Sequence, residues 1–193
     1  MKRSLLSFAV ALATCLCGFS QSKTDVLEDV ISSRRSIRKY TEQKVDRAVL
    51  DRIVKNGLLA PSGMNAQSYE LRIVDDPELL EAISRSVSPS RKSIFVGATA
   101  VIFIANGESY DLSQVDCGLL SQNIMLSAHS LGLGSCCMGA PIRQMQNSDA
   151  CAKYIEKLGF SKGYNLLLAI ALGYPAEQPS SRPRKDSMVK YVE

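Results

Sequence analysis

The chain has 193 residues, of which 46% are hydrophobic and 22% charged, and this composition predicts one folded globular domain rather than a disordered chain. The formal net charge of +4 is small, and the basic residues are not interleaved with a row of aromatic ones, so nucleic acid is not expected as a partner. The single histidine, His129, lies far in sequence from any obvious nucleophile, which argues against Ser/His/Asp hydrolysis. The cysteines and the histidine do not show the spacing that is typical of a zinc site. Any catalysis is therefore expected to depend on a cofactor.

The first twenty residues are typical of a secretory signal. Two basic residues precede an apolar run that ends at Phe19, and small residues occupy the positions that a signal peptidase reads before Gln21. The run is too short to favour a membrane span. This pattern predicts a signal peptide over residues 1–20, one domain over residues 21–193, and an exported protein, periplasmic if the source is bacterial.

Two alternatives for the leader stay open. The stretch Leu12-Ala13-Thr14-Cys15 resembles a lipoprotein cleavage box, in which Cys15 would carry the lipid, although Thr14 is bulkier than the residue usual at that place. An uncleaved leader would instead form a helical anchor. A membrane is thus expected as a partner only if the leader is retained or lipidated.

A basic stretch follows the first predicted helix of the domain. Apolar residues at helical spacing predict a helix around 26–31 that Asp25 caps, and a second helix over 46–59 that ends at Pro61. Between them lies Arg34-Arg35-Ser36-Ile37-Arg38. Guanidinium groups present forked donors that match phosphate oxygens, so these residues predict an anion site.

The middle of the chain alternates between loops, strands and helices. Residues 61–68 form a loop rich in small and amide residues, and the alternation over 69–74 predicts a strand. A helix opens at Pro77, and the serine-rich residues 84–93 are expected to form a mobile connection. An unbroken apolar run over 98–105 predicts a strand that is covered on both faces.

The last part completes one layered α+β domain. The predicted elements are a central helix over 113–131, a short buried piece at 135–139, a helix from 141 to about 158 and a buried strand over 166–172. The polar tail that follows ends in apolar and aromatic residues, and its natural docking surface is a second copy of the chain. The four cysteines of the mature chain could pair by number, but the adjacent Cys136 and Cys137 cannot easily bridge to each other, so free thiols are expected.

Four features remain to build a pocket, since neither a GxGxxG nor a GxxxxGK[ST] motif is present. They are the basic stretch, the amide loop, the segment Cys136-Cys137-Met138-Gly139, and the late basic group Arg182, Arg184 and Lys185. Each has a simpler interpretation alone: loop amides satisfy backbone groups, Cys137 and Met138 fill a core, and tail charges are solvated. Together they supply what a planar, phosphorylated cofactor needs.

These motifs, in this order and at roughly this spacing, resemble the FMN-dependent nitroreductase family. The resemblance rests on the following segments and covers nearly all of residues 26–193: Arg34-Arg35-Ser36-Ile37-Arg38 with Tyr40, Ala60-Pro61-Ser62-Gly63-Met64-Asn65-Ala66-Gln67, Gly132-Leu133-Gly134-Ser135-Cys136-Cys137-Met138-Gly139, Gly173-Tyr174-Pro175, and Arg182-Pro183-Arg184-Lys185. It departs from the family where Ser68-Tyr69 replace the usual Pro and Trp.

The resemblance implies a nitroreductase-like α+β fold, with a central antiparallel sheet flanked by helices, in an intertwined homodimer that holds two FMN molecules at its interface. By position, the FMN phosphate and ribityl chain would be bound by Arg34, Arg35, Ser36, Arg182 and Arg184, and Arg38 would reach the pyrimidine edge of the ring. The partner subunit would contribute Pro61, Ser62, Gly63 and Asn65, with Gln67 near them. The backbone of Met138 and Gly139 would face flavin N5 and O4.

The implied activity is that of an FMN-dependent NAD(P)H oxidoreductase. In a ping-pong reaction, hydride passes from NAD(P)H to FMN N5 and the electrons pass on to a nitro-aromatic, quinone or similar small-molecule acceptor. No catalytic side chain is predicted. The leader conflicts with this donor, because NAD(P)H is not freely available outside the cytoplasm. Two alternatives therefore stay open: an exported FMN-binding protein without NAD(P)H turnover, and a structural homodimer with a degenerate pocket, against which the arginines argue.

Overall fold

The computed structural model describes residues 22–90 and 93–192, so the predicted signal peptide and Cys15 lie outside the described residues. The chain divides into two compact units between Ser32 and Ser33. The first contains helix α2 (Lys23–Ser33) except for its last residue, and the start of this helix corrects the prediction of Asp25 as the cap. The backbone N–H of Asp25 donates to the Ser22 hydroxyl, and the Asp25 carboxylate accepts from the Ser22 N–H. Ser22 is the cap, and Asp25 completes a capping box.

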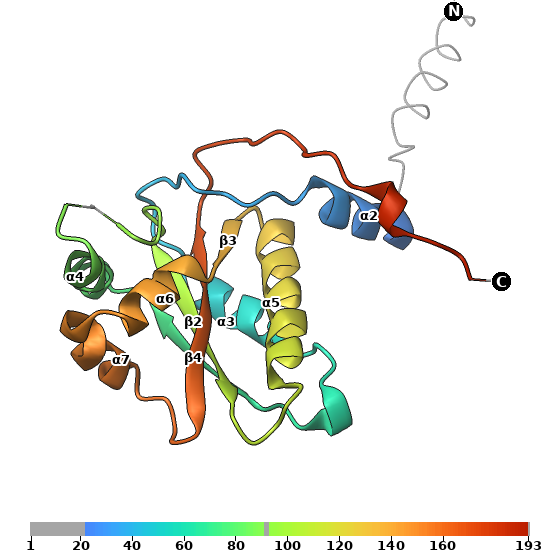
Figure 1. The fold of residues 1–193 in the computed structure, drawn as a ribbon. Coiled ribbons are helices and arrows are strands. Elements are labelled where there is room, and N and C mark those ends of the chain that lie inside the picture. Colours follow the sequence, from blue (N-terminus) through green and yellow to red (C-terminus); the bar gives the residue numbers. More distant parts are fainter. Residues whose placement is uncertain (1–21, 91–92, 193) are drawn as a thin grey trace, which may run out of the picture. The chain divides into compact units, whose positions relative to one another are not determined.

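The second unit is built on an antiparallel sheet, drawn in Figure 1. Its order is β1-β2-β4-β3, and each neighbouring pair is antiparallel. The strands are β1 (Tyr69–Val74), β2 (Ala100–Gly107), β3 (Gly134–Met138) and β4 (Tyr164–Gly173). The short piece expected at 135–139 is thus an edge strand of this sheet. β2 and β4 lie in the middle, as expected for the two most apolar runs.

Helices cover both faces of the sheet, with α3 and α5 on one face and α4, α6 and α7 on the other (Figure 1). Successive residues of β2 alternate between the two cores: Ile102 and Ile104 pack with α3 and α5, and Val101 and Phe103 with the other helices. The helices are α3 (Arg47–Gly57), α4 (Pro77–Val87), α5 (Ser113–Ser130), α6 (Ala140–Gln146) and α7 (Ala152–Leu158). The expected α+β fold with a central antiparallel sheet is confirmed.

Two sequence predictions about helices were wrong. Helix α4 continues to Val87 through the serines that predicted a mobile connection, because the hydroxyl of Ser84 donates to the Leu80 carbonyl and accepts from the N–H of Ile94. The helix predicted from 141 to 158 is broken into α6 and α7 by a 3-10 turn, η2 (Asp149–Cys151). Across the described ranges, no helix is long and apolar enough to cross a bilayer.

Candidate cofactor site

The basic stretch runs alongside the end of the sheet rather than into solvent. Ser36 forms a parallel bridge with Ser135 on edge strand β3, and the backbone N–H of Ile37 donates to the Ser135 carbonyl at 2.9 Å. The N–H of Thr41 donates to the Tyr174 carbonyl, also at 2.9 Å. The segment 36–41 therefore acts as an extra, partly paired strand, which fixes where the arginines can reach.

This close approach depends on Gly134, the first residue of β3. A Cβ at this position would lie 2.8–2.9 Å from three carbon atoms of the buried Ile37 side chain. We expect Gly134→Ala to push the basic segment off the strand and to lower the free energy of unfolding by about 1–3 kcal/mol, the usual cost of overpacking. Thermal and urea unfolding measure this. Gly118→Ala in α5 is the control, because its Cβ would meet nothing within 4 Å; equal stability of the two variants would contradict the close contact.

The charges of two arginines of the basic segment act on the cysteines of β3. Burial raises the pKa of the Cys136 thiol, while the positive charges of Arg38 and Arg34 and a hydrogen bond with Ser36 act to lower it, so these groups lie near one another. The positive charge of Arg34 also acts to lower the pKa of the neighbouring Cys137 thiol. Cys136 is buried and Cys137 exposed, as expected for alternate residues of an edge strand. All four cysteines that the structure describes are free thiols.

Nε of Arg34 and the hydroxyl of Ser135 are buried in this region and have no hydrogen-bond partner among the described residues. A buried donor without an acceptor costs about 1–3 kcal/mol, so such groups usually have a partner of some kind. An anionic ligand with several oxygens would supply it, and the donor set therefore fits a phosphate group.

The tail begins at the same place. The N–H of Ala176 donates to the Lys39 carbonyl at 2.9 Å, and the N–H of Arg38 donates to the Glu177 carboxylate. Tyr40, whose pKa is raised chiefly by burial, donates its hydroxyl to the carbonyl of Ile37. The first residues of the tail therefore hold the backbone of the basic segment in place. The sequence pattern gave no sign of Glu177, a lone acid in a polar stretch.

Of the other predicted residues, one pair directly follows β3 and one pair lies on the exposed tail. Met138 ends β3 and Gly139 starts α6, so their backbone follows directly on the strand that the arginines line. Arg182 and Arg184 are exposed on the tail, and no described hydrogen bond or ion pair joins them to the basic segment.

The amide loop lies at the other end of the second unit. Its residues 63–65 form a 3-10 turn, η1 (Gly63–Asn65), whose Gly63 N–H donates to Asp116 in the first turn of α5. The basic segment instead pairs with β3, which follows the last turn of α5. Since α5 has 18 residues, about 27 Å of helix separates its two ends. The two halves of the predicted pocket therefore do not meet within one chain.

The amide loop is nevertheless a built structure. The N–H of Gln67 donates to the Ser62 hydroxyl and the side-chain amide of Gln67 donates to Asn65, each at 3.1 Å. Met64, Asn65 and Gln67 all have positive φ, a conformation that non-glycine residues rarely adopt. Asp116, which anchors this loop, was not found from the sequence. The available signal was an acid within a helix that is apolar on most sides.

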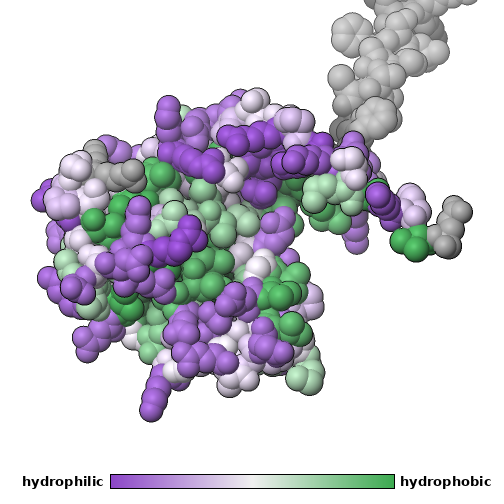
Figure 2. Space-filling model, in the orientation of Figure 1, coloured by the Kyte–Doolittle hydropathy of each residue, from purple (hydrophilic) through white to green (hydrophobic). Residues whose placement is uncertain are grey.

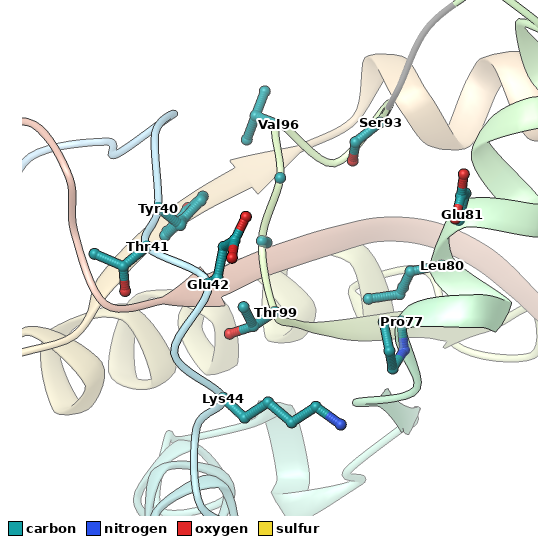
Figure 3. A pocket seen from close by; sticks show the side chains of 12 residues that line it. Tyr40, Thr41, Glu42, Lys44, Pro77, Leu80, Glu81, Ser93, Val96 and Thr99 are labelled. Atoms are coloured by element: carbon teal, nitrogen blue, oxygen red, sulfur yellow. The ribbon is translucent and has the colours of Figure 1, made fainter.

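A separate cavity of about 630 Å³ is lined in part by residues of the 40–44 segment, Tyr40 among them. Figure 3 shows Glu42 and Lys44 beside its apolar wall, to which Leu80 and Pro77 contribute. Among the described residues, its lining holds no buried polar atom that lacks a partner. It therefore shows no sign of a missing ligand comparable to that at Arg34.

The fold and the site define an α+β protein with a basic segment beside an edge strand and, at a distance, the loop that was predicted to complete its pocket. A family model described as the nitroreductase family matches residues 31–90 and 84–174. A candidate NADH dehydrogenase/NAD(P)H nitroreductase of Methanothermobacter thermautotrophicus is 34% identical over 167 residues, 83% of each chain. The chain belongs to the nitroreductase family.

Solved structures agree with this assignment. An FMN-dependent nitroreductase of Clostridium difficile is 34% identical with a TM-score of 0.66, and the match covers 84% of this chain and 94% of that one. A nitroreductase of Desulfitobacterium hafniense with bound FMN is 25% identical with a TM-score of 0.78, and the match covers 87% and 98% of the two chains.

Proposed function

We propose that this protein is an FMN-dependent NAD(P)H oxidoreductase. The observation that carries the proposal is the basic segment 34–38, which is fixed against β3 and buries a guanidinium nitrogen of Arg34 without a described acceptor. The similar nitroreductases named above support FMN as the group that fits there. Bound FMN would accept hydride from NAD(P)H and pass the electrons to an oxidised small molecule, a nitro-aromatic compound or a quinone.

Each predicted residue has a task in this site. Arg34, Arg35 and Ser36 would bind the phosphate and ribityl chain, and Arg38 would place a positive charge near the pyrimidine edge, where it stabilises developing negative charge. Arg182 and Arg184 would complete the phosphate site once the tail is fixed. Met138 and Gly139 would present their backbone to the reactive edge of the ring. No side chain is needed as a proton donor, so none is assigned as catalytic.

We propose that the complete site forms in a homodimer, because one chain leaves it incomplete. The loop Pro61–Gln67 would come from the partner subunit, with Ser62, Gly63, Asn65 and Gln67 lining the ring. Surface hydrophobic residues support a second copy: Val115 and Leu119 of α5 are 57% and 42% exposed, and Leu59, just after α3, is 79% exposed. Figure 2 shows hydrophobic side chains at the surface over α5. Such a face favours association.

The leader favours a second candidate function, an exported FMN-binding protein that does not turn over NAD(P)H. Its basic start and short apolar run are typical of a signal peptide. We propose export, with a periplasmic location or a lipid anchor at Cys15 in a bacterial source. In that compartment the electrons would have to come from another donor.

The visible spectrum of the purified protein tests these proposals. We expect a bound flavin that NADH or NADPH bleaches without air and that a quinone or nitro-aromatic compound restores. A flavin spectrum that neither nicotinamide changes would favour the second candidate. Absence of flavin binding after addition of FMN would contradict both.

A further inference from the structure

We propose that Asp116 is a positioning residue that holds the amide loop in the shape required to bind the partner subunit's FMN. This inference rests on the proposed function, because it assumes that FMN binds in a homodimer. It gives a role to a residue outside the predicted site. Asp116 would touch neither the flavin nor the substrate. It would act through the backbone of Gly63.

Asp116 is a buried acid. It is only 2% exposed and lies in the first turn of α5. One carboxylate oxygen accepts from the N–H of Gly63 at 3.2 Å. The other oxygen is buried and has no hydrogen-bond partner in the described part of the chain. Burying a carboxylate is costly, so a residue without a specific task at this place would more often be apolar.

The loop held by Asp116 needs such an anchor. Left-handed backbone at Met64, Asn65 and Gln67 costs about 1 kcal/mol or more per residue. This shape turns the loop tightly and leaves the side chains of Met64, Asn65 and Gln67 exposed. The hydrogen bonds from Gln67 to Ser62 and Asn65 lie within the loop, whereas the bond from Gly63 to Asp116 ties it to the helix. Asp116 thus connects the loop to rigid structure.

The negative charge of Asp116 acts on two tyrosines. The Tyr69 hydroxyl is buried without a described partner, and the pKa of Tyr69 is raised first by burial and then by the negative charge of Asp116. The same charge also raises the pKa of Tyr110, after the effect of burial. A Cβ added at Gly63 would lie 1.9 Å from the Tyr110 hydroxyl. Gly63 therefore packs directly on Tyr110 while it donates to Asp116. The position of the loop is determined from two sides.

Alanine and asparagine at position 116 separate a positioning role from a general effect. Asp116→Asn keeps a carbonyl oxygen for the Gly63 N–H and is expected to bind FMN within about threefold of the wild type. Asp116→Ala removes the acceptor and is expected to weaken FMN binding by at least about tenfold, the range for a lost hydrogen bond to a charged group. Fluorescence titration of the apo dimer with FMN measures both. Asp116→Leu, which fills the space without a polar atom, replaces Asp116→Ala if that variant does not fold.

A mixed dimer tests the action on the partner. One chain carries Asp116→Ala and the other Arg34→Ala, and two affinity tags isolate the heterodimer. If Asp116 serves the partner's flavin, both defects fall in the same site. The other site is intact, and the heterodimer should bind one FMN with wild-type affinity. If Asp116 acts only within its own chain, neither site is intact and no tight binding remains.

The outcomes distinguish this inference from the proposed function. A wild-type dimer that does not bind FMN would contradict the proposed function itself. A wild-type dimer that binds FMN, beside an Asp116→Ala dimer that is less stable but binds FMN equally well, would make Asp116 a structural residue only. A heterodimer without a wild-type site would also overturn the inference.

Discussion

Alanine in place of Arg34 is expected to abolish the retention of FMN during purification without unfolding the protein. The positive charge of Arg34 acts to lower the pKa values of the Cys136 and Cys137 thiols on β3, and its Nε is buried without a described acceptor. A charged hydrogen bond to phosphate contributes about 1.5–3 kcal/mol, so the loss of one such bond weakens binding by about 10- to 150-fold. A bidentate contact would add to this loss.

Folding and binding are expected to respond in opposite ways to this substitution. Removal of a buried donor that has no described partner should leave the stability of the apoprotein unchanged or slightly higher. Thermal unfolding without FMN measures stability, and equilibrium titration measures affinity. Arg52→Ala, at an exposed position of α3, is the matched control and should change neither quantity. FMN affinity that is unchanged in Arg34→Ala would show that the phosphate binds elsewhere.

The second large effect is expected at the exposed face of α5. A double substitution, Val115→Asp and Leu119→Asp, places two like charges one helical turn apart on the surface proposed to meet a second copy. Both positions are exposed in one chain, so the monomer should remain folded. Because the amide loop and the basic segment would then never meet, FMN binding is expected to fall together with dimerisation.

Analytical ultracentrifugation and FMN titration at the same protein concentrations test this coupling. Ala152→Asp on α7, an exposed residue over the opposite face of the sheet, is the control and should remain dimeric. A monomer that still binds FMN tightly would show that one chain provides a complete site. A double variant that remains dimeric would place the interface on another surface.

Local patterns predicted most of the fold. The alternation at 69–74 coincides with β1, most of the apolar run at 98–105 lies in β2, and Pro77 opens a helix as expected. These signals succeed because the pleat and the helical turn impose periods on the chain that burial makes visible. The serines of α4 failed as a loop signal because Ser84 bonds to its own helix, a contact that composition does not reveal.

Only some residues of the candidate site could be predicted from the sequence, for a related reason. The basic stretch and the Met138-Gly139 segment carry recognisable residue types, and the structure brings them together at one end of the sheet. Asp116 and Glu177 act on backbone N–H groups that are distant in sequence. Nothing in the local pattern identifies the partner of a single carboxylate, so such positioning contacts become visible only in the folded chain.

The sequence by itself determined the class of elements and the family resemblance, and it predicted an anion site, because residue type and spacing are local properties. Only the tertiary structure decided that the arginines line an edge strand and that the amide loop is fixed at the far end of α5. The physical reason is that antiparallel pairing and helix length set distances that no local pattern contains. Those distances separate the two halves of the predicted site within one chain.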